Sequence, residues 1–348
     1  MSPTSQAPEL HYPFATAPEA GHYERIADGL YWLHMPLPIT SLNHINLWLL
    51  ESENGFNIVD TGWATEENIG VWEYVEQNLF QQRPIERVVA THMHPDHIGL
   101  AGWLTETYQS DLYMSRDEYL NCHLLLRYSH EEAPKAAVNF YRAAGYDEQQ
   151  LQKYRAHFGQ FGQFVRYLPH AYHRLVDGDH LPMGGYDWEV IVGSGHSPEH
   201  VCLYDAERNI FIAGDQLLPK ISSNVSVWPT EPHANPLAEW LASCHKLLAR
   251  LDDDTLVLPA HGKPFYGAPA RLRYLITDIE ENLEKLAEFC QTPQRPVDTF
   301  PVLFHGPISS SNLMMAAGES LAHLHCLQAR GIVEVTYEEG VGYWQTRA

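Results

Sequence analysis

The chain has 348 residues, of which 45% are hydrophobic, enough to fill one large domain and a small appendage. Its 44 acidic residues outnumber its 22 lysines and arginines, and the formal charge of −22 disfavours nucleic-acid binding, which depends on cations that replace the counterions of phosphates. Five scattered cysteines without a Cys-x-x-Cys pair, and no segment near the roughly 20 apolar residues that cross a bilayer, indicate a cytoplasmic protein with free thiols and no membrane partner.

Two parts of the chain alternate strand-like and helical patterns. After an N-terminal extension of residues 1–23, residues 24 to about 112 combine strand-like runs with a helix around 66–78. The same style resumes from 181 to about 290. We therefore expect residues 24–290 to form the main domain and residues 291–348 to form a small C-terminal module.

A dense group of imidazoles follows the apolar run 88–90: Thr91-His92-Met93-His94-Pro95-Asp96-His97. Imidazole and carboxylate groups together suit zinc and similar divalent metals. His92 and His94 can project the same way from an extended segment, whereas Asp96 and His97 point elsewhere. One tight turn could therefore supply ligands to two metals.

Residues 115–180 interrupt the strand pattern with helix-like sequence, broken at Pro134, Gly145, Gly159 and Gly162. This insertion is neutral, with eight acidic and eight basic residues, and it is rich in tyrosine and phenylalanine. It is either a small helical subdomain whose aromatic residues form a core, or a cap that gives the metals apolar walls and offers a few cations to an anionic substrate.

Three later strand-like runs also stop at a polar turn that holds a potential ligand. The run 188–192 leads through Gly193-Ser194-Gly195 to His196, and the glycines permit a sharp turn there. The run 209–213 leads through Gly214 to Asp215, and the run 255–260 leads to His261. An apolar run followed by a ligand residue thus occurs four times.

In this order the residues resemble the metallo-β-lactamase fold superfamily, whose pattern is His-x-His-x-Asp-His, then a distant His, a distant Asp and a final His. The resemblance spans residues 24 to about 265 and extends to glyoxalase II-like hydrolases with a winged-helix-like C-terminal module. It implies an α+β fold, a four-layer αβ/βα sandwich of two mixed sheets. With 21 histidines in the chain a lone His-x-His pair is more often structural, but the whole ordered set seldom arises by chance.

The resemblance also implies two divalent metal ions, zinc in the first place and iron or manganese as alternatives. Three histidines would hold one ion: His92, His94 and His196. Three side chains would hold the other: Asp96, His97 and His261. Asp215 would bridge the two ions together with a hydroxide.

Other polar residues near these motifs are expected to support the ligands. Asp60 closes the run 56–59 and looks like the superfamily's early Asp-x-Gly feature, so we expect it to hold a ligating histidine without touching metal. His200 is expected to give hydrogen-bonding support, although Glu199 stands where many relatives carry glycine. His44 and His323 are among the histidines better explained as structural or surface residues.

Two residues after Asp215 are candidates for substrate binding. Lys220 would lie near the rim of the pocket and could anchor a carboxylate or phosphate, although a solvated surface lysine is an equal alternative. Asn224 is a weaker candidate for a polar contact.

The C-terminal part begins with an amphipathic helix opened by Pro269. We expect it to pack on the main domain, with a homodimer seam as the minority alternative. A helix over 311–330, a cap at Gly331 and a hairpin of 332–337 with 342–345 resemble a winged helix. Its helix has no lysine or arginine between 313 and 328, so we predict a packing or oligomerisation element and no nucleic-acid partner.

Two adjacent divalent ions make a hydroxide available at neutral pH, so hydrolysis is the expected chemistry. The leading hypothesis is cleavage of a thioester or carboxylic ester, lactones included, in a small anionic or coenzyme-linked substrate, with Asp96 as proton relay. An endoribonuclease or phosphodiesterase of the same fold is the first alternative. The second alternative is a mononuclear iron oxygenase or a non-catalytic member. It fits less well, because relatives with redox chemistry either bind one iron with fewer ligands or carry Glu in place of His94.

Overall fold

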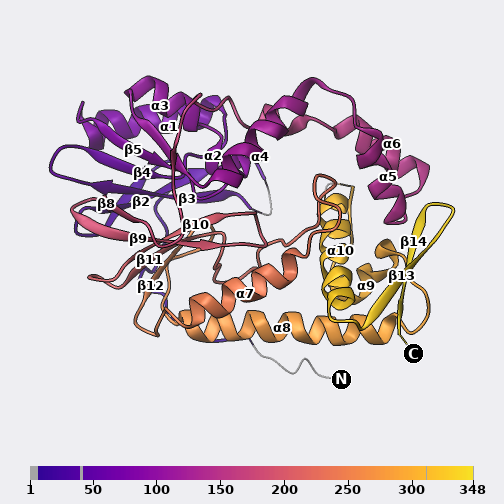
Figure 1. Ribbon diagram of the computed structural model, residues 1–348. Helices are drawn as coiled ribbons and strands as arrows, with labels where there is room; N and C mark the ends of the chain where they lie inside the picture. Colours follow the sequence, from indigo (N-terminus) through magenta and orange to yellow (C-terminus); the bar gives the residue numbers. More distant parts are fainter. Residues whose placement is uncertain (1–6, 40–41, 311, 348) are drawn as a thin grey trace.

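The computed structural model describes residues 7–39, 42–310 and 312–347. Two large β-sheets face one another, and helices cover the outer face of each (Figure 1). The first sheet has seven strands in chain order, and the second has five in the order β12-β11-β10-β9-β8.

The first sheet follows the chain, and its strands are β1 (Tyr23–Ala27), β2 (Leu30–Pro36), β3 (His44–Glu51), β4 (Phe56–Val59), β5 (Ile85–Val89), β6 (Asp111–Met114) and β7 (His173–Arg174). Neighbours from β1 to β4 pair antiparallel, and neighbours from β4 to β7 pair parallel. The sheet is therefore mixed, as predicted.

The second sheet is also mixed, and its strands are β8 (His180–Met183), β9 (Tyr186–Gly193), β10 (His200–Asp205), β11 (Ile210–Gly214) and β12 (Leu256–Pro259). Strands β8 to β11 pair antiparallel in turn, whereas β11 and β12 are parallel. The parallel connection is made by α7 (Pro236–Leu248), which lies against the outer face of this sheet (Figure 1).

Side chains alternate between the two faces of each strand, and this alternation produces the layers. In β4, Val59 packs between the sheets, whereas Ile58 packs outward against α1 (Glu66–Val75) and α3 (Ala101–Tyr108). In β11, Ile212 packs between the sheets, whereas Phe211 packs outward against α7 and α8 (Ala268–Phe289). The order helix, sheet, sheet, helix confirms the predicted α+β sandwich.

The helix predicted over 66–78 is longer and less regular than expected. The α-helix ends at Val75, and a π-helical segment, Glu76–Phe80, continues it. This wider turn brings the ring of Phe80 to 4.6 Å from that of Phe56, and Phe80 is fully buried. Burial of one aromatic side chain thus overrides the regular helical repeat.

The insertion is mainly helical, as predicted, with α4 (Arg116–Arg127), α5 (Lys135–Ala143) and α6 (Glu148–His157). Pro134 precedes α5, Gly145 and Gly159 follow α5 and α6 with positive φ, but Gly162 lies inside the short 3-10 helix Gln160–Gln163. The chain also returns to the first sheet as β7, a strand too short and too exposed to show a hydrophobic pattern.

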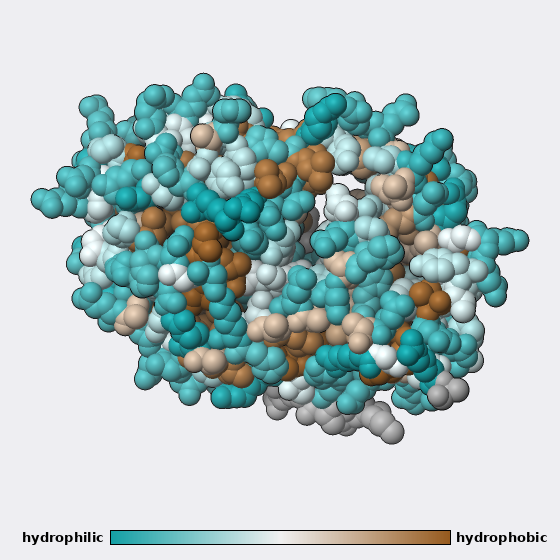
Figure 2. Space-filling model, viewed as in Figure 1, coloured by the Kyte–Doolittle hydropathy of each residue, from teal (hydrophilic) through white to brown (hydrophobic). Residues whose placement is uncertain are grey.

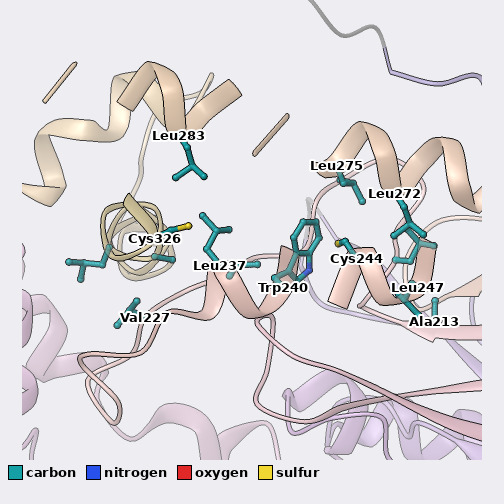
Figure 3. Packing of buried hydrophobic residues seen from close by; sticks show 14 of the residues in the cluster. Ala213, Val227, Leu237, Trp240, Cys244, Leu247, Leu272, Leu275, Leu283 and Cys326 are labelled. Atoms are coloured by element: carbon teal, nitrogen blue, oxygen red, sulfur yellow. The ribbon is translucent and has the colours of Figure 1, made fainter. Parts of the chain in front are cut away.

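The C-terminal part packs directly on the main domain. It contains α9 (Phe300–Leu303), α10 (Leu313–Ala329) and the predicted hairpin of β13 (Val333–Glu338) and β14 (Val341–Thr346), while the predicted start at Ser311 lies outside the described residues. Cys326 of α10 and Leu283 of α8 belong to the same buried cluster as Trp240 of α7 (Figure 3). The divisions after residues 23 and 290 stay predictions.

The predicted amphipathic helix is α8, with Pro269 in its first turn. It buries the predicted face, including Leu272, Leu275 and Leu286, against α7 and α10. Neither α8 nor any other helix within the described ranges combines the length and apolar character needed to span a membrane.

Candidate metal centre

The predicted ligands gather at one edge of the two sheets, where β5, β9, β11 and β12 end (Figure 1). The backbone N–H of Val201, in β10, donates to the carbonyl of Thr91, two residues after β5, over 2.8 Å. The backbone N–H of Ala260 donates to the carbonyl of Gly214 over 2.9 Å. The first bond joins the two sheets, and the second joins the ends of two neighbouring strands of the second sheet.

Two glycines are required by the close packing of these loops. Gly195 has φ +106°, and a Cβ there would lie 2.4 Å from Cβ of Trp240. Gly214 has φ +50°, and a Cβ there would lie 2.5 Å from Cε1 of His200. Glycine adopts a positive φ without strain and has no Cβ to clash with these neighbours. The two glycines therefore determine the positions of the next residues, His196 and Asp215.

The first group of potential ligands contains three histidines and an aspartate whose donor atoms all lie within 4.8 Å of one another: His92, His94, His196 and Asp215. Nε2 of His92 lies 2.8 Å from Nδ1 of His94 and 3.3 Å from Nε2 of His196. Three ring nitrogens thus converge on one point.

The second group contains Asp96, His97 and His261, whose donor atoms also lie within 4.8 Å of one another. Nε2 of His261 lies 3.3 Å from Oδ2 of Asp96. Asp215 stands between the groups, since its Oδ2 lies 3.3 Å from Nε2 of His196 and 3.6 Å from Nε2 of His97, and its Oδ1 lies 3.4 Å from Nε2 of His261.

The outer ring nitrogens of three histidines are hydrogen-bonded away from the centre. Nδ1 of His97 donates to Oδ2 of Asp60 over 2.7 Å, Nδ1 of His196 to the carbonyl of Asn224 over 2.7 Å, and Nδ1 of His261 to the carbonyl of His44 over 2.8 Å. Because these acceptors carry no proton, each bond fixes the tautomer that leaves Nε2 free to bind metal.

Several inward-facing atoms have no hydrogen-bond partner among the described residues. Nε2 of His97, Nε2 of His261 and Oδ1 of Asp215 are all buried in this state. Buried polar atoms without partners are unfavourable and therefore uncommon in folded proteins. Imidazole and carboxylate donors that converge in this way fit divalent metal ions.

The surroundings of His92 and Asp215 favour the form of each side chain that can bind metal. Burial lowers the pKa of His92 well below its usual value, and the neighbouring His97 and His94 lower it further. Burial raises the pKa of Asp215, but His261 and His97 outweigh this effect and hold the pKa well below its usual range. The imidazole of His92 is therefore neutral and the carboxyl of Asp215 ionised.

Asp60 and His200 make hydrogen bonds of the kind predicted for supporting residues. Besides holding His97, Asp60 accepts the backbone N–H of Thr91 through Oδ1 over 2.8 Å. Nε2 of His200 accepts the backbone N–H of Asp215 over 3.0 Å. Both residues therefore hold candidate ligands from outside the centre. His44 and His323 are also hydrogen-bonded within the fold.

Glu118 of α4 is a buried residue of this region that the sequence did not single out. Its fully buried carboxylate accepts the backbone N–H of Met93 through Oε2 and that of Glu199 through Oε1, both over 2.9 Å. Glu199 in turn accepts the backbone N–H of Asp117 over 3.0 Å. Glu118 and Glu199 together thus tie α4 to the loops that carry the candidate ligands.

The two predicted substrate contacts differ in their surroundings. Lys220 is exposed, and its side chain makes no hydrogen bond or ion pair within the described ranges. The side chain of Asn224 is already engaged: Nδ2 donates to Oε2 of Glu319 over 2.9 Å, and Oδ1 accepts the hydroxyl of Ser226 over 2.7 Å. Lys220 is free to meet a ligand, whereas Asn224 is held.

Relatives with curated descriptions match most of the chain. The chain is 22% identical to the probable metallo-hydrolase YqjP of Bacillus subtilis over 326 residues, which cover 90% of this chain and 97% of the relative. It is 23% identical to the human acyl-coenzyme A thioesterase MBLAC2 over 254 residues, which cover 70% of this chain and 81% of the relative. It is 20% identical to the hydroxyacylglutathione hydrolase GloC of Haemophilus influenzae, covering 65% and 89%.

Solved structures and family models agree with this relationship. A β-lactamase domain protein from Burkholderia ambifaria is 37% identical, with a TM-score of 0.89 and coverage of 97% of this chain and 98% of that one. A metallo-β-lactamase family protein from Thermus thermophilus is 27% identical, with a TM-score of 0.76 and coverage of 93% and 100%. Residues 283–346 match the metallo-β-lactamase-like C-terminal domain. Because residues 41–261 match the metallo-β-lactamase superfamily model, the chain belongs to that superfamily and is one of its hydrolases.

Proposed function

We propose that this protein is a binuclear zinc hydrolase that cleaves a thioester, or a carboxylic ester including a lactone, in a small anionic or coenzyme-linked substrate. The observation that carries the proposal is the position of Asp215, whose two carboxylate oxygens face both groups of histidines. A carboxylate in that position can bridge two ions, which a site for a single ion does not require.

The ligand assignment follows the two groups. His92, His94 and His196 would hold one ion, Asp96, His97 and His261 the other, and Asp215 both. When bound, two zinc ions supply a hydroxide nucleophile at neutral pH and polarise a substrate carbonyl.

Asp96 is the residue we assign to proton transfer. Its side chain is 15% exposed, whereas that of His97 beside it is fully buried. Burial raises the pKa of Asp96, but His97 and His261 outweigh this effect and keep the pKa below its usual value. An ionised carboxylate at the open side of the centre can accept the proton of the nucleophile and pass it to the leaving group.

The named relatives favour thioester chemistry. MBLAC2 is described as an acyl-coenzyme A thioesterase, and GloC as a hydroxyacylglutathione hydrolase, whose substrate is also a thioester. The formal charge of −22 argues against a polyanionic substrate such as RNA. A small substrate with few phosphates or carboxylates is compatible with that charge.

The surface beside the centre favours a substrate with an apolar portion. Figure 2 shows a hollow at the middle of this face, with hydrophobic residues gathered where Figure 1 places α4. Leu120 and Leu124 of α4 are 54% and 37% exposed, and α4 is tied to the metal loops through Glu118. We propose that this part of the insertion contacts the acyl chain.

The test is to supply zinc-loaded protein with acyl-coenzyme A thioesters, a hydroxyacylglutathione, lactones and an RNA oligomer, and to measure turnover of each. We expect thiol release from at least one thioester and loss of that activity in Asp215→Ala. Cleavage of RNA alone would select the endoribonuclease alternative. One tightly bound iron per chain, without hydrolysis, would select the oxygenase alternative.

A further inference from the structure

Residues 223–227 connect the candidate metal centre to α10, although α10 contributes none of the proposed ligands. On one side, the hydroxyl of Ser223 donates to the carbonyl of Asp215, and the carbonyl of Asn224 accepts Nδ1–H of His196. On the other side, the backbone N–H of Val227 donates to the carbonyl of Gly318 over 3.0 Å. Residues 223–227 thus contact two proposed ligands, Asp215 and His196, and also contact α10.

The side chain of Asn224 completes the connection. Its Nδ2 donates to Oε2 of Glu319 in α10 over 2.9 Å, and its Oδ1 accepts the hydroxyl of Ser226 over 2.7 Å. Both ends of the amide are thus satisfied. Because the side chain is held at both ends, the peptide that carries the Asn224 carbonyl is held with it, and that carbonyl sets the orientation of the His196 ring.

The helix α10 lies directly against residues 223–227 beside Glu319. A Cβ at Gly318 would lie 2.7 Å from Cβ of Ser226 and 3.0 Å from the carbonyl oxygen of Val227, so the helix touches the segment directly. Behind the segment lies a cavity of about 30 Å³, lined by residues that include Val225, Trp240, Glu319 and His323. Val225 and Val227 pack into the buried cluster that contains Trp240, and the hydrogen bonds of Asn224 hold the residue beside them.

We propose that Glu319 is a positioning residue for His196, acting through Asn224, so that α10 sets the metal affinity of the group formed by His92, His94 and His196. The inference rests on the proposed function in one respect, which is that this group binds metal. Outer partners of metal-bound histidines typically contribute about 10-fold to 100-fold to affinity. Glu319 contacts His196 only through Asn224, so we expect its contribution to zinc affinity to be at the lower end of that range.

The experiment measures zinc affinity of the full chain by competition with a chromogenic chelator. We expect about 10-fold weaker binding of one zinc ion in Glu319→Ala. In ¹⁵N-histidine-labelled zinc-loaded protein, the Nδ1 proton of His196 should shift or exchange faster with solvent. Met315→Ala is the matched control, because Met315 lies on the same helix, is 44% exposed, and accepts the hydroxyl of Ser226 through its backbone carbonyl, which the substitution keeps.

A second pair of variants tests the contact from the other side. Assayed at pH 8 or above, where Glu319 with its pKa of about 7 is mostly ionised, Asn224→Asp places two carboxylates in contact and should weaken zinc binding as Glu319→Ala does, without altering α10. Combining Asn224→Asp with Glu319→Gln should restore affinity, because the amide introduced at 319 can donate to the carboxylate introduced at 224. If Glu319→Ala does not fold, this rescue decides the question alone.

The outcomes separate this inference from the proposed function. Wild-type affinity in folded Glu319→Ala or in Asn224→Asp, or absence of rescue in the double variant, overturns the role of Glu319 and leaves the binuclear hydrolase intact. Failure of the wild-type protein to bind zinc at this group overturns both.

Discussion

Oδ2 of Asp60 lies 2.7 Å from Nδ1 of His97, and both side chains are almost completely buried. Asp60 also has φ +64°, a conformation that aspartate and asparagine tolerate better than most residues. A strained position directly after β4 thus holds a carboxylate behind one of the proposed ligands. Such strain is characteristic of residues that serve a site.

Asp60→Asn should therefore lower zinc affinity without unfolding the protein. Asparagine keeps the backbone conformation, but its NH₂ replaces one of the two oxygens that accept from Thr91 and from Nδ1 of His97, and we expect about 10-fold to 100-fold weaker binding. Elemental analysis after dialysis against graded chelator measures this. Asp60→Ala should be worse, since alanine also disfavours positive φ, and equal affinity in wild type and Asp60→Asn would contradict the role.

Asp215→Ala should remove the contact shared by the two proposed ions. We expect retained zinc to fall below two ions per chain and hydrolysis to fall by at least about 100-fold, because both groups lose a ligand. Asp187→Ala, at an exposed position of β9, is the control for loss of one negative charge. Unchanged stoichiometry in Asp215→Ala would contradict a bridging carboxylate.

Glu118→Gln should destabilise the protein by about 1–3 kcal/mol, because a buried amide can accept only one of the two backbone N–H groups and its NH₂ then faces the other. Urea denaturation of the zinc-loaded protein measures the loss. Glu132→Gln, an exposed change in the same insertion, should have no effect. Equal losses in both variants would show that Glu118 does not join α4 to the metal loops.

Stability should depend on pH through Glu319. Burial raises the pKa of Glu319 from 4.5 to about 7, while the Asn224 amide lowers it. The folded protein therefore binds this proton more tightly than the unfolded chain, so the ionised form destabilises the fold as pH rises from 4.5 to 7.

Glu319→Gln removes this ionisation and keeps an acceptor for Asn224. Its melting temperature relative to wild type should therefore increase between pH 5 and pH 8, by roughly 2–5 °C. Thermal denaturation at several pH values measures the difference, and the exposed Glu338→Gln gives the baseline. A difference that stays constant with pH would contradict the raised pKa.

Leu124→Ser should change selectivity between substrates. If α4 contacts the acyl chain, KM should rise about 3-fold to 10-fold for long acyl thioesters and little for short ones, since about 1 kcal/mol of apolar contact is lost. Ile332→Ser is matched in exposure, since both residues are 37% exposed, but lies beside the C-terminal hairpin. Equal effects of the two variants on KM would contradict the proposed contact.

The sequence was most informative where structure is local. An apolar run that stops at Asp215 or His261 shows both the strand and the residue at its end, because burial and exposure alternate over a few positions. The layers followed from the same alternation. The order of ligands along the chain then indicated the family.

The sequence did not predict contacts between distant segments. Glu118 is one of eight acidic residues in a neutral insertion, and nothing in its neighbours marks it as buried. Asn224 was noticed for its polarity, whereas its carbonyl holds His196 and its side chain reaches Glu319. Such pairings depend on how helices cross the sheets, which local patterns do not determine.

The support that α10 gives to residues 223–227 has a consequence for biosynthesis. Strands β5, β9, β11 and β12 leave the ribosome before α10. A nascent chain can therefore contain every proposed ligand before Glu319 is present to hold Asn224, whose carbonyl accepts Nδ1–H of His196. Full zinc retention is thus expected only after the C-terminal helix has docked. A polypeptide shortened before α10 should then be recovered poor in metal, even if its sheets assemble.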